Sequence, residues 1–207
     1  MGKQQYIPDG SFKTEIVIKN SRFITYGVPA GSVEEARHLI KTAREDHVGS
    51  SHVVYAFVVG GGKRELAGMS DDGEPKGTAA RPVMDVLKGS GIVDLLVMVV
   101  RYFGGTKLGT GGLVKAYGDC ARHVIEGLPV KRLVELVDFS IDLPYNIFRE
   151  VKEAVLDAGS EIISEDFGDM IKIKGQMAIA RFDECKRAIE EISRGGVSLI
   201  KKEKGKR

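Results

Sequence analysis

Residues 99–117 read VVRYFGGTKLGTGGLVKAY and contain three kinds of local structure, one after another. The first three residues close an apolar run over 92–101, which predicts a strand buried on both faces in the centre of a sheet. Tyr102–Gly112 is rich in glycine, which predicts a loop. From Leu113 to Glu126 apolar residues recur at helical spacing. We therefore expect a central strand that runs through a glycine-rich loop directly into a helix.

Upstream of this stretch, the pattern predicts further strands and one helix. Ser32 and Glu35 have the spacing of a capping box, and they open a helix that runs to Asp46. Alternating and β-branched segments predict the strands of the same sheet. The expected strands are Phe12–Ile18, Arg22–Val28, His52–Val59 and a short partner of the last one at Arg64–Ala67.

A second loop lies between these strands and the central one. Residues 70–83 read SDDGEPKGTAARPV, and the turn-forming residues over 68–77 predict a loop. Thr78 is expected to cap a helix that runs from there to Lys88. The two loops therefore each precede a helix.

Asp71, Asp72 and Glu74 place three carboxylates within four residues of this second loop. Their oxygens can accept hydrogen bonds from nearby N–H groups in a structural turn, contact a partner or ligand, or bind a hard cation. An EF-hand loop that starts at Asp71 fails, because its sixth position is Lys76 instead of glycine and its twelfth is Pro82 instead of glutamate. We expect a structural turn and no metal site.

The glycine-rich loop leads into a helix start, where free N–H groups and the positive end of the helix dipole suit an anion. Lys107 and Lys115 add positive charge, and Lys76 lies in the other loop. The named phosphate motifs fail, because Thr110-Gly111 replaces the Walker Lys-Ser/Thr pair and the third Rossmann glycine is missing. Tight strand–helix packing without a ligand is the alternative. The candidate loop residues are Gly104, Gly105, Gly109, Thr110, Gly111 and Gly112.

Arg101 ends the buried strand, and Tyr102 follows it. Ligands commonly bind at strand ends in α/β sheets, and an arginine there can grip a phosphate or carboxylate in a bidentate manner. Tyr102 can stack on a base. In the alternative arrangement, Arg101 pairs with a carboxylate of the acidic loop and the aromatic side chains lie in the core.

The last third of the chain reads as a separate domain. A boundary near 129–133 gives two expected domains, 1–131 and 132–207. The order βαββαβ in the second is that of the ferredoxin-like split βαβ. The fold class is therefore α+β with two domains. The expected elements are strand 133–141, helix 145–157, strands 161–167 and 170–178, helix 182–193 and strand 197–202.

The composition excludes several protein classes. The 29 acidic and 31 basic residues nearly balance, so bulk charge indicates neither a nucleic-acid nor a membrane partner, although 1–132 carries 18 basic against 14 acidic side chains. No apolar run approaches the roughly 18 residues of a membrane span. Cys120 and Cys185 lie on separate helical patterns, which favours reduced thiols and a cytoplasmic location. Fourteen of the 26 glycines fall between Gly60 and Gly118, which indicates positive φ angles or close backbone approach there.

The two loop segments together resemble the YigZ/IMPACT family. SDDGEPKGTAARPV and VVRYFGGTKLGTGGLVKAY carry the resemblance, which covers about 12–128, with the family's bacterial C-terminal domain over about 133–203. The resemblance implies that the first domain has the α/β fold of a small-subunit ribosomal protein domain and of domain four of elongation factor G. It implies that the second domain is similar to the ferredoxin-like fifth domain of that factor.

Eukaryotic relatives of this family regulate translation under amino-acid starvation through a protein partner. The resemblance therefore implies a cytosolic, translation-related regulatory or binding protein that contacts RNA, the ribosome or a translation factor through the glycine-rich loops. One alternative is a phosphate- or nucleotide-dependent enzyme, similar to small-molecule kinases, that uses the same loops. Another is a protein-partner adaptor. No cofactor and no membrane partner are expected.

Overall fold

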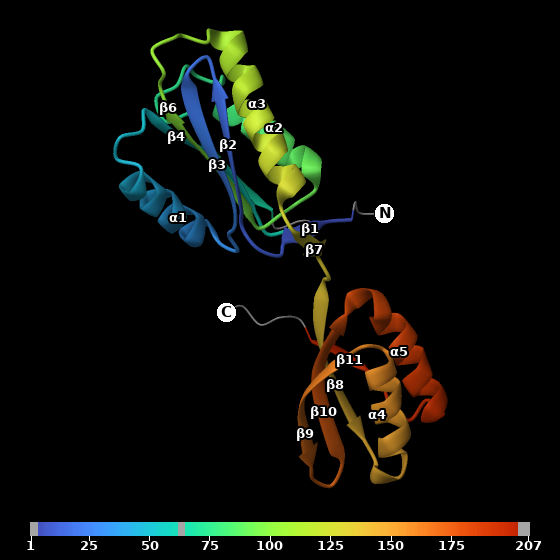
Figure 1. The fold of residues 1–207 in the computed structure, drawn as a ribbon. Coiled ribbons are helices and arrows are strands. Elements are labelled where there is room, and N and C mark those ends of the chain that lie inside the picture. The colour runs from blue at the N-terminus through green and yellow to red at the C-terminus, as the bar shows by residue number, and fades with distance from the viewer. Residues whose placement is uncertain (1–3, 62–64, 203–207) are drawn as a thin grey trace. The chain divides into compact units, whose positions relative to one another are not determined.

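The computed structural model describes residues 4–61 and 65–202. The chain forms two compact units, Met1–Leu133 and Val134–Arg207. Each unit combines strands with helices, and the colours of Figure 1 run from blue to yellow in the first and from yellow to red in the second. The predicted α+β class is confirmed.

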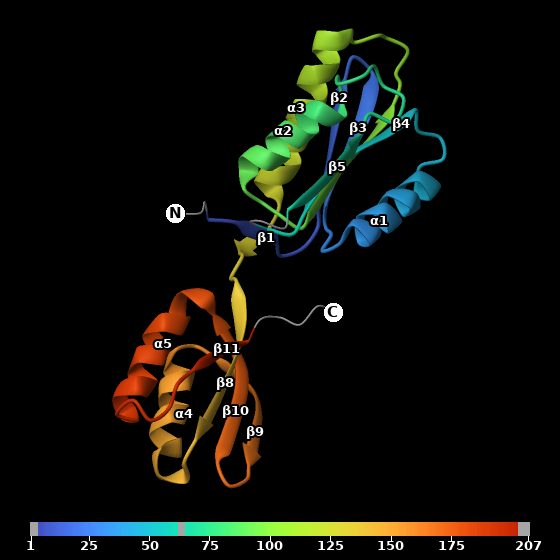
Figure 2. The ribbon, with the colours of Figure 1, turned by 180° about the vertical axis from the view of Figure 1, so that it is seen from behind.

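A five-stranded sheet forms the middle layer of the first unit, in the order β2-β3-β6-β4-β5 (Figures 1 and 2). Every neighbouring pair of strands is antiparallel. The central strand is the apolar run that the sequence predicts, and helices on both faces of the sheet bury it. The strands are β2 (Phe12–Ile18), β3 (Ser21–Pro29), β4 (His52–Val59), β5 (Leu66–Ser70) and β6 (Leu95–Tyr102).

Strand β5 differs from its predicted extent. The expected segment begins at Arg64, which lies outside the described residues, and the expected loop begins at Gly68. Instead, β5 pairs with β4 as far as Ser70, which lies opposite Tyr55. Gly68 fits within the strand because its missing side chain leaves room for the Phe57 ring, which a Cβ would approach to 2.4 Å.

Helices cover both faces of this sheet: α1 lies on one face, and α2 and α3 lie on the other (Figures 1 and 2). The Ser32 hydroxyl accepts a hydrogen bond from the Glu35 N–H at 3.0 Å, as predicted. The Glu35 carboxylate accepts from the Gly31 N–H at 2.8 Å, one residue before the partner in a capping box. In the described residues, no helix is long and apolar enough to cross a membrane. The helices are α1 (Val33–Asp46), α2 (Ala80–Ser90) and α3 (Thr110–Gly127).

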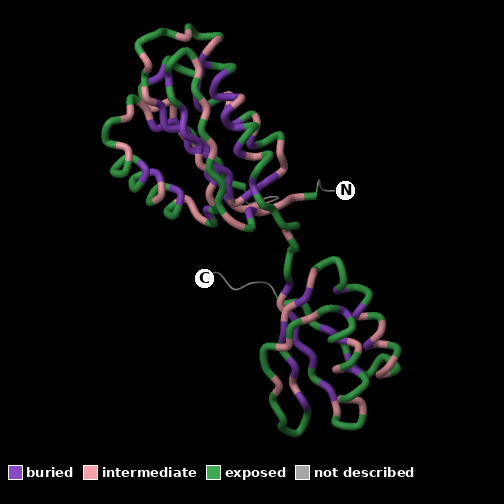
Figure 3. Tube along the Cα trace, viewed as in Figure 1, coloured by how far each residue is buried: buried purple, intermediate pink, exposed green. Residues whose placement is uncertain are grey.

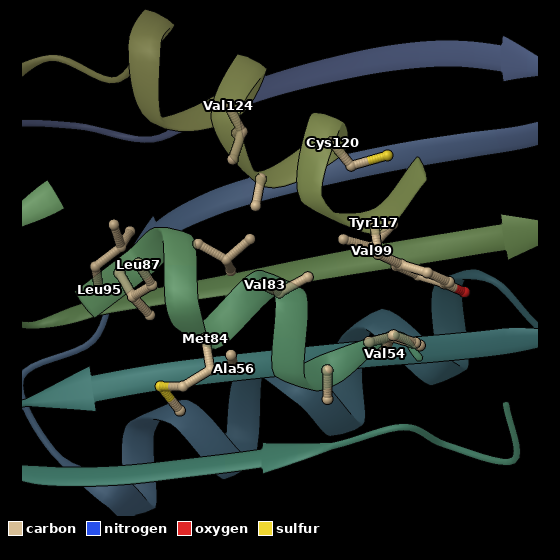
Figure 4. Close-up of a cluster of buried hydrophobic side chains, with 14 of the residues drawn as sticks. Val54, Ala56, Val83, Met84, Leu87, Leu95, Val99, Tyr117, Cys120 and Val124 are labelled. Atoms are coloured by element: carbon tan, nitrogen blue, oxygen red, sulfur yellow. The ribbon is translucent and has the colours of Figure 1, made fainter. Parts of the chain in front are cut away.

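Apolar side chains from the sheet, α2 and α3 form a buried core, and Figure 3 colours the buried positions of these elements purple. Figure 4 shows Val83 and Leu87 of α2 close to the central strand, with Tyr117 of α3 beside Val99. Burial raises the pKa of the Cys120 thiol to about 12. This thiol therefore stays protonated at neutral pH and packs as a small apolar side chain.

A short two-stranded ladder completes the first unit. It joins β1 (Tyr6–Pro8) to β7 (Val130–Arg132) in antiparallel pairing. The Val93 N–H donates to the Tyr6 carbonyl at 2.9 Å, which fastens β1 to the turn before β6. The segment after α3 therefore belongs to the first unit through Leu133, the last residue of the predicted boundary region 129–133.

The second unit is a four-stranded antiparallel sheet with two helices on one face (Figure 1). Its strand order β11-β8-β10-β9 and its element order confirm the predicted ferredoxin-like βαββαβ fold. Residues Tyr145–Ile147 form a 3-10 turn before α4. Helix α5 begins directly after β10, three residues earlier than the pattern predicts. The elements are β8 (Leu136–Leu143), α4 (Phe148–Asp157), β9 (Glu161–Phe167), β10 (Ile171–Ala178), α5 (Ile179–Ile192) and β11 (Ile200–Lys202).

Gly175 of β10 has no room for a side chain. A Cβ there would lie 2.3 Å from the Glu161 carbonyl oxygen and 2.7 Å from the Phe139 ring. We expect Gly175→Ala to destabilise the second unit by about 1–3 kcal/mol, because the ring or the neighbouring strand must shift. Urea denaturation followed by circular dichroism measures the loss. Gly168→Ala is the control, since its Cβ would approach other atoms no closer than 3.8 Å; equal losses in both variants would contradict the prediction.

Candidate functional site

The two loops that the sequence singles out lie at one end of the five-stranded sheet. Because β4 runs antiparallel between β5 and β6, these two strands run in the same direction and both loops leave the same end (Figure 1). The β2–β3 turn and the segment before β4 lie there too, and the Ser51 N–H donates to the Arg101 carbonyl at 2.8 Å. We call this region the loop end, and it comprises residues 19–20, 47–51, 71–79 and 103–109.

Asp71 caps the start of α2. Its carboxylate accepts hydrogen bonds from the backbone N–H groups of Gly77 at 2.8 Å, Ala79 at 3.2 Å and Ala80 at 2.8 Å. Burial would raise the pKa of this carboxyl, but the three N–H donors together hold it below its usual value. The prediction that Thr78 caps the helix is wrong, because its hydroxyl donates to a carbonyl within the loop at 2.7 Å.

Asp72 fastens the acidic loop to β4 and α1. Its carboxylate accepts from the Val53 N–H at 2.7 Å and from the Arg44 guanidinium at 2.5 Å. Its carbonyl oxygen lies 2.8 Å from His52 Nδ1, and a carbonyl only accepts, so this nitrogen carries the hydrogen. Asp72 therefore takes part in a structural turn, which is one of the expected arrangements.

Glu74 joins the acidic loop to the central strand and to α3. Its side chain is only 3% exposed, and it forms an ion pair with Arg101 at 2.6 Å. The Tyr117 hydroxyl donates to the same carboxylate oxygen at 2.8 Å. Burial and the neighbouring Glu74 charge raise the pKa of Tyr117 far above its usual value, so its hydroxyl remains a donor. His52 Nε2 lies 3.8 Å from this oxygen.

Arg101 is directed into the protein. Its guanidinium carbon lies 5.4 Å from the centre of the Phe23 ring and 5.6 Å from that of Phe103. One terminal nitrogen donates to Glu74, and the other donates to the Ser21 hydroxyl at 3.4 Å. The structure contains the predicted pairing of Arg101 with a carboxylate of the acidic loop, but the aromatic side chains that follow are not both in the core, because Phe103 is 49% exposed.

Tyr102 lies on the opposite face of the sheet from Arg101, because successive strand residues alternate between faces. Its hydroxyl lies 2.8 Å from His47 Nδ1, and the other ring nitrogen of this histidine lies 2.9 Å from the Tyr26 hydroxyl. The Arg22 guanidinium lies 5.6 Å from the centre of the Tyr102 ring. The structure therefore does not bring Tyr102 together with the glycine-rich loop.

Different structural constraints explain the individual glycines of the glycine-rich loop. Gly104 packs against the β2–β3 turn so closely that a Cβ would lie 2.0 Å from the Asn20 carbonyl carbon. Gly105 and Gly109 have φ values of +86° and +76°, a region that favours glycine. The predicted loop ends too late, because α3 begins at Thr110 and already contains Gly111 and Gly112.

The start of α3 borders a shallow hollow of about 380 Å³. The cap position is Gly109, which has no side chain to bond the first N–H groups of the helix. The first turn also contains no acidic residue. Lys19 from the β2–β3 turn and Lys115 from α3 both reach this hollow. Its lining residues are Ile18, Lys19, Leu108, Gly112, Lys115, Ala116 and Asp119.

Four exposed lysines surround the loop end: Lys19, Lys76, Lys107 and Lys115. In the part of the chain that the structure describes, none of them lies within ion-pair distance of a carboxylate. Sequence reasoning identified three of them but missed Lys19, whose position in a predicted turn was the available signal. It also missed Phe103, which is 49% exposed beside the buried Arg101.

The Asp71 cap makes stability depend on pH. Because the folded pKa of Asp71 is lowered, its stabilising effect is present above the unfolded pKa of about 3.9 and is lost as the pH falls through the folded value. We expect Asp71→Asn to lose about 1–2 kcal/mol of unfolding free energy at pH 7, because the amide has one acceptor oxygen where the carboxylate uses both. The difference from the wild type should narrow below about pH 4.

Urea denaturation at several pH values measures this difference. Asp85→Asn is the matched control, because Asp85 is an exposed carboxylate in the body of the same helix that pairs with Arg81 at the surface. A loss for Asp71→Asn that stays constant down to pH 2–3 would contradict the capping role.

Removing the Glu74 carboxylate should leave the buried Arg101 charge without a partner and lower the free energy of unfolding. We expect Glu74→Ala to destabilise the first unit by about 3–5 kcal/mol, because the Arg101 guanidinium stays buried without its partner. The double variant Glu74→Leu/Arg101→Met should lose less than Glu74→Ala alone. Chemical denaturation compares the two variants with the wild type, and a double variant that loses as much as Glu74→Ala, or more, would contradict the prediction.

The chain has relatives of known sequence and structure along most of its length. The family model described as the Impact N-terminal domain matches residues 19–125, which contain the whole loop end. The IMPACT family member YigZ of Escherichia coli is 33% identical over 184 residues, 88% of this chain and 90% of that protein. An IMPACT family member of Haemophilus influenzae is 37% identical over 162 residues, 78% of this chain and 79% of the relative.

A crystal structure of a hypothetical protein is similar to this chain over both units. It is 31% identical, with a TM-score of 0.70, and the match covers 99% of this chain and 100% of the other. The match of the family model over more than half of the chain agrees with the resemblance of the two loop segments. The chain belongs to the IMPACT family.

Proposed function

We propose that this IMPACT family protein is a cytosolic, translation-related regulatory protein that binds RNA through its loop end. The observation that carries the proposal is the division of charge there. Internal hydrogen bonds hold the three carboxylates of the loop end, whereas its lysines face the solvent without partners among the described residues. Cations that no carboxylate neutralises suit the phosphates of a nucleic acid.

The residues expected to contact phosphate come from three segments. Lys19 lies in the β2–β3 turn, Lys76 in the acidic loop, and Lys107 and Lys115 lie before and within the start of α3. Backbone N–H groups in the first turn of α3 are expected to add donors to the same surface. These backbone donors belong to Thr110, Gly111 and Gly112.

The family resemblance supports a role in translation, and the ribosome is accordingly the expected RNA-rich target.

The kinase-like alternative has weaker support. Phosphoryl transfer needs a carboxylate that holds a metal ion and a group that acts as a base. Asp71, Asp72 and Glu74 each accept hydrogen bonds from different parts of the protein and do not converge. No group of three or more metal-ligating side chains occurs over residues 4–61 and 65–202. The three carboxylates thus act as structural side chains in this proposal.

The salt dependence of binding tests the RNA proposal. Titrations with ribosomes and with a structured RNA at about 50 and 200 mM salt should give an affinity that falls steeply with salt. Lys107→Ala and Lys115→Ala should each weaken binding and reduce the slope of log affinity against log salt by about 1. Filter binding or fluorescence anisotropy measures both quantities.

Lys88→Ala is the control for these variants, because Lys88 is an exposed lysine at the other end of α2. It should bind like the wild type. Absence of binding to ribosomes and RNA at low salt would overturn the proposal. If the protein, freed of RNA, bound a translation factor in a salt-dependent manner, the partner would be a protein instead of RNA. The same lysines would then contact an acidic protein surface.

A further inference from the structure

We propose that Phe103 is a stacking platform for an unpaired RNA base, an assignment that rests on the proposed RNA-binding function. Phe103 lies in the glycine-rich loop and is 49% exposed, although it is a large apolar side chain on a charged surface. An exposed aromatic ring among cations is the combination that proteins use to bind single-stranded nucleic acid. The other aromatic residue of the motif, Tyr102, is held by His47 on the opposite face of the sheet.

A buried cation lies close to the ring of Phe103. The Arg101 guanidinium lies 5.6 Å from its centre, and the Phe23 ring lies 5.4 Å from the same guanidinium. The ion pair with Glu74 and the hydrogen bond to Ser21 fix the orientation of Arg101. The Phe103 ring therefore lies beside a fixed cation and is still 49% exposed, which leaves ring surface for a base.

The backbone around Phe103 is fixed on both sides. The Phe103 N–H donates to the Ser51 hydroxyl at 3.2 Å, and the Gly104 N–H donates to the Ser21 hydroxyl at 3.2 Å. Gly104 also packs directly against the backbone of Asn20. Because the backbone of this part of the loop is held before binding, ordering it on binding costs little conformational entropy.

The charges around the ring favour a nucleic acid over a protein segment. Lys107 follows Phe103 in the same loop, and Lys19 lies in the turn that Gly104 touches. Stacking needs a free base face, which single-stranded loops and bulges offer and paired helices do not. The expected ligand is therefore a single-stranded or bulged segment whose phosphates face the lysines while one base covers Phe103.

A tryptophan reporter tests this stacking directly, because the chain contains no tryptophan. Phe103→Trp places the only indole of the protein at this position, and stacking with a base should quench its fluorescence. Titration with a 12-nucleotide oligoadenylate should quench the variant, and a fully paired duplex of the same length should quench it far less. Phe167→Trp is the matched control, since Phe167 is 55% exposed but lies in the second unit.

A second variant separates stacking from general apolar contact. Phe103→Leu keeps an apolar side chain but removes the flat ring, so it should weaken binding of the oligoadenylate by about tenfold. Its salt dependence should stay that of the wild type, because no lysine changes. Its thermal unfolding midpoint should change little, because leucine keeps an apolar side chain at this half-exposed position.

The outcomes distinguish this assignment from the function on which it rests. If the wild type binds oligoadenylate with steep salt dependence, but Phe103→Trp is not quenched and Phe103→Leu binds as tightly, the stacking role is wrong and the RNA-binding function stands. If the wild type binds no RNA at low salt, both are overturned. Quenching of Phe103→Trp together with weaker binding by Phe103→Leu supports both.

Discussion

The buried ion pair between Glu74 and Arg101 is the contact on which the loop end depends. It connects the acidic loop to the end of β6, and the Tyr117 hydroxyl extends it to α3. Removing two charges from water costs several kcal/mol per ion. Most of the attraction between the two charges only compensates for this cost. The pair therefore adds little to the overall free energy of unfolding. Its main effect is to fix the position of one loop relative to the other. It also fixes the guanidinium behind Phe103.

This arrangement explains how a chain of nearly balanced charge presents a basic surface. The acidic loop contributes three carboxylates, but Asp71 faces the start of α2, Asp72 faces β4 and Glu74 faces the core. The lysines of the same region have no such internal partners among the described residues. The lysines therefore dominate the exposed charge at this end of the sheet, because Glu74 and Arg101 are buried together and internal hydrogen bonds hold Asp71 and Asp72.

Most of the fold follows from the sequence, because hydrophobic periodicity is a local signal. The apolar run over 92–101, the start of α1 at Ser32 and the βαββαβ order all agree with the structure. The cap of α2 could not be predicted in this way. Ala80 is capped by Asp71, nine residues upstream, and this contact exists only once the loop folds back. A local pattern at Thr78 consequently points to the wrong residue.

The candidate site was harder to predict, for two physical reasons. Strand alternation already implies that Arg101 and Tyr102 point to opposite faces, so treating them as one site overlooked an available signal. By contrast, nothing in the sequence brings Lys19 to the start of α3, because about ninety residues separate them. The sequence allowed Arg101 to pair with any of the three carboxylates of the acidic loop. Only the folded structure shows that its partner is Glu74.

The concentration of glycine has two causes that composition alone cannot separate. Gly105 and Gly109 supply positive φ angles, whereas Gly104 allows the loop to rest on the backbone of Asn20. The second cause matters more for the site, because this close approach brings the β2–β3 turn and its Lys19 against the loop that carries Phe103. A larger residue at position 104 would push the two apart. The glycines thus hold this loop against the β2–β3 turn, which places the exposed Phe103 ring near Lys19.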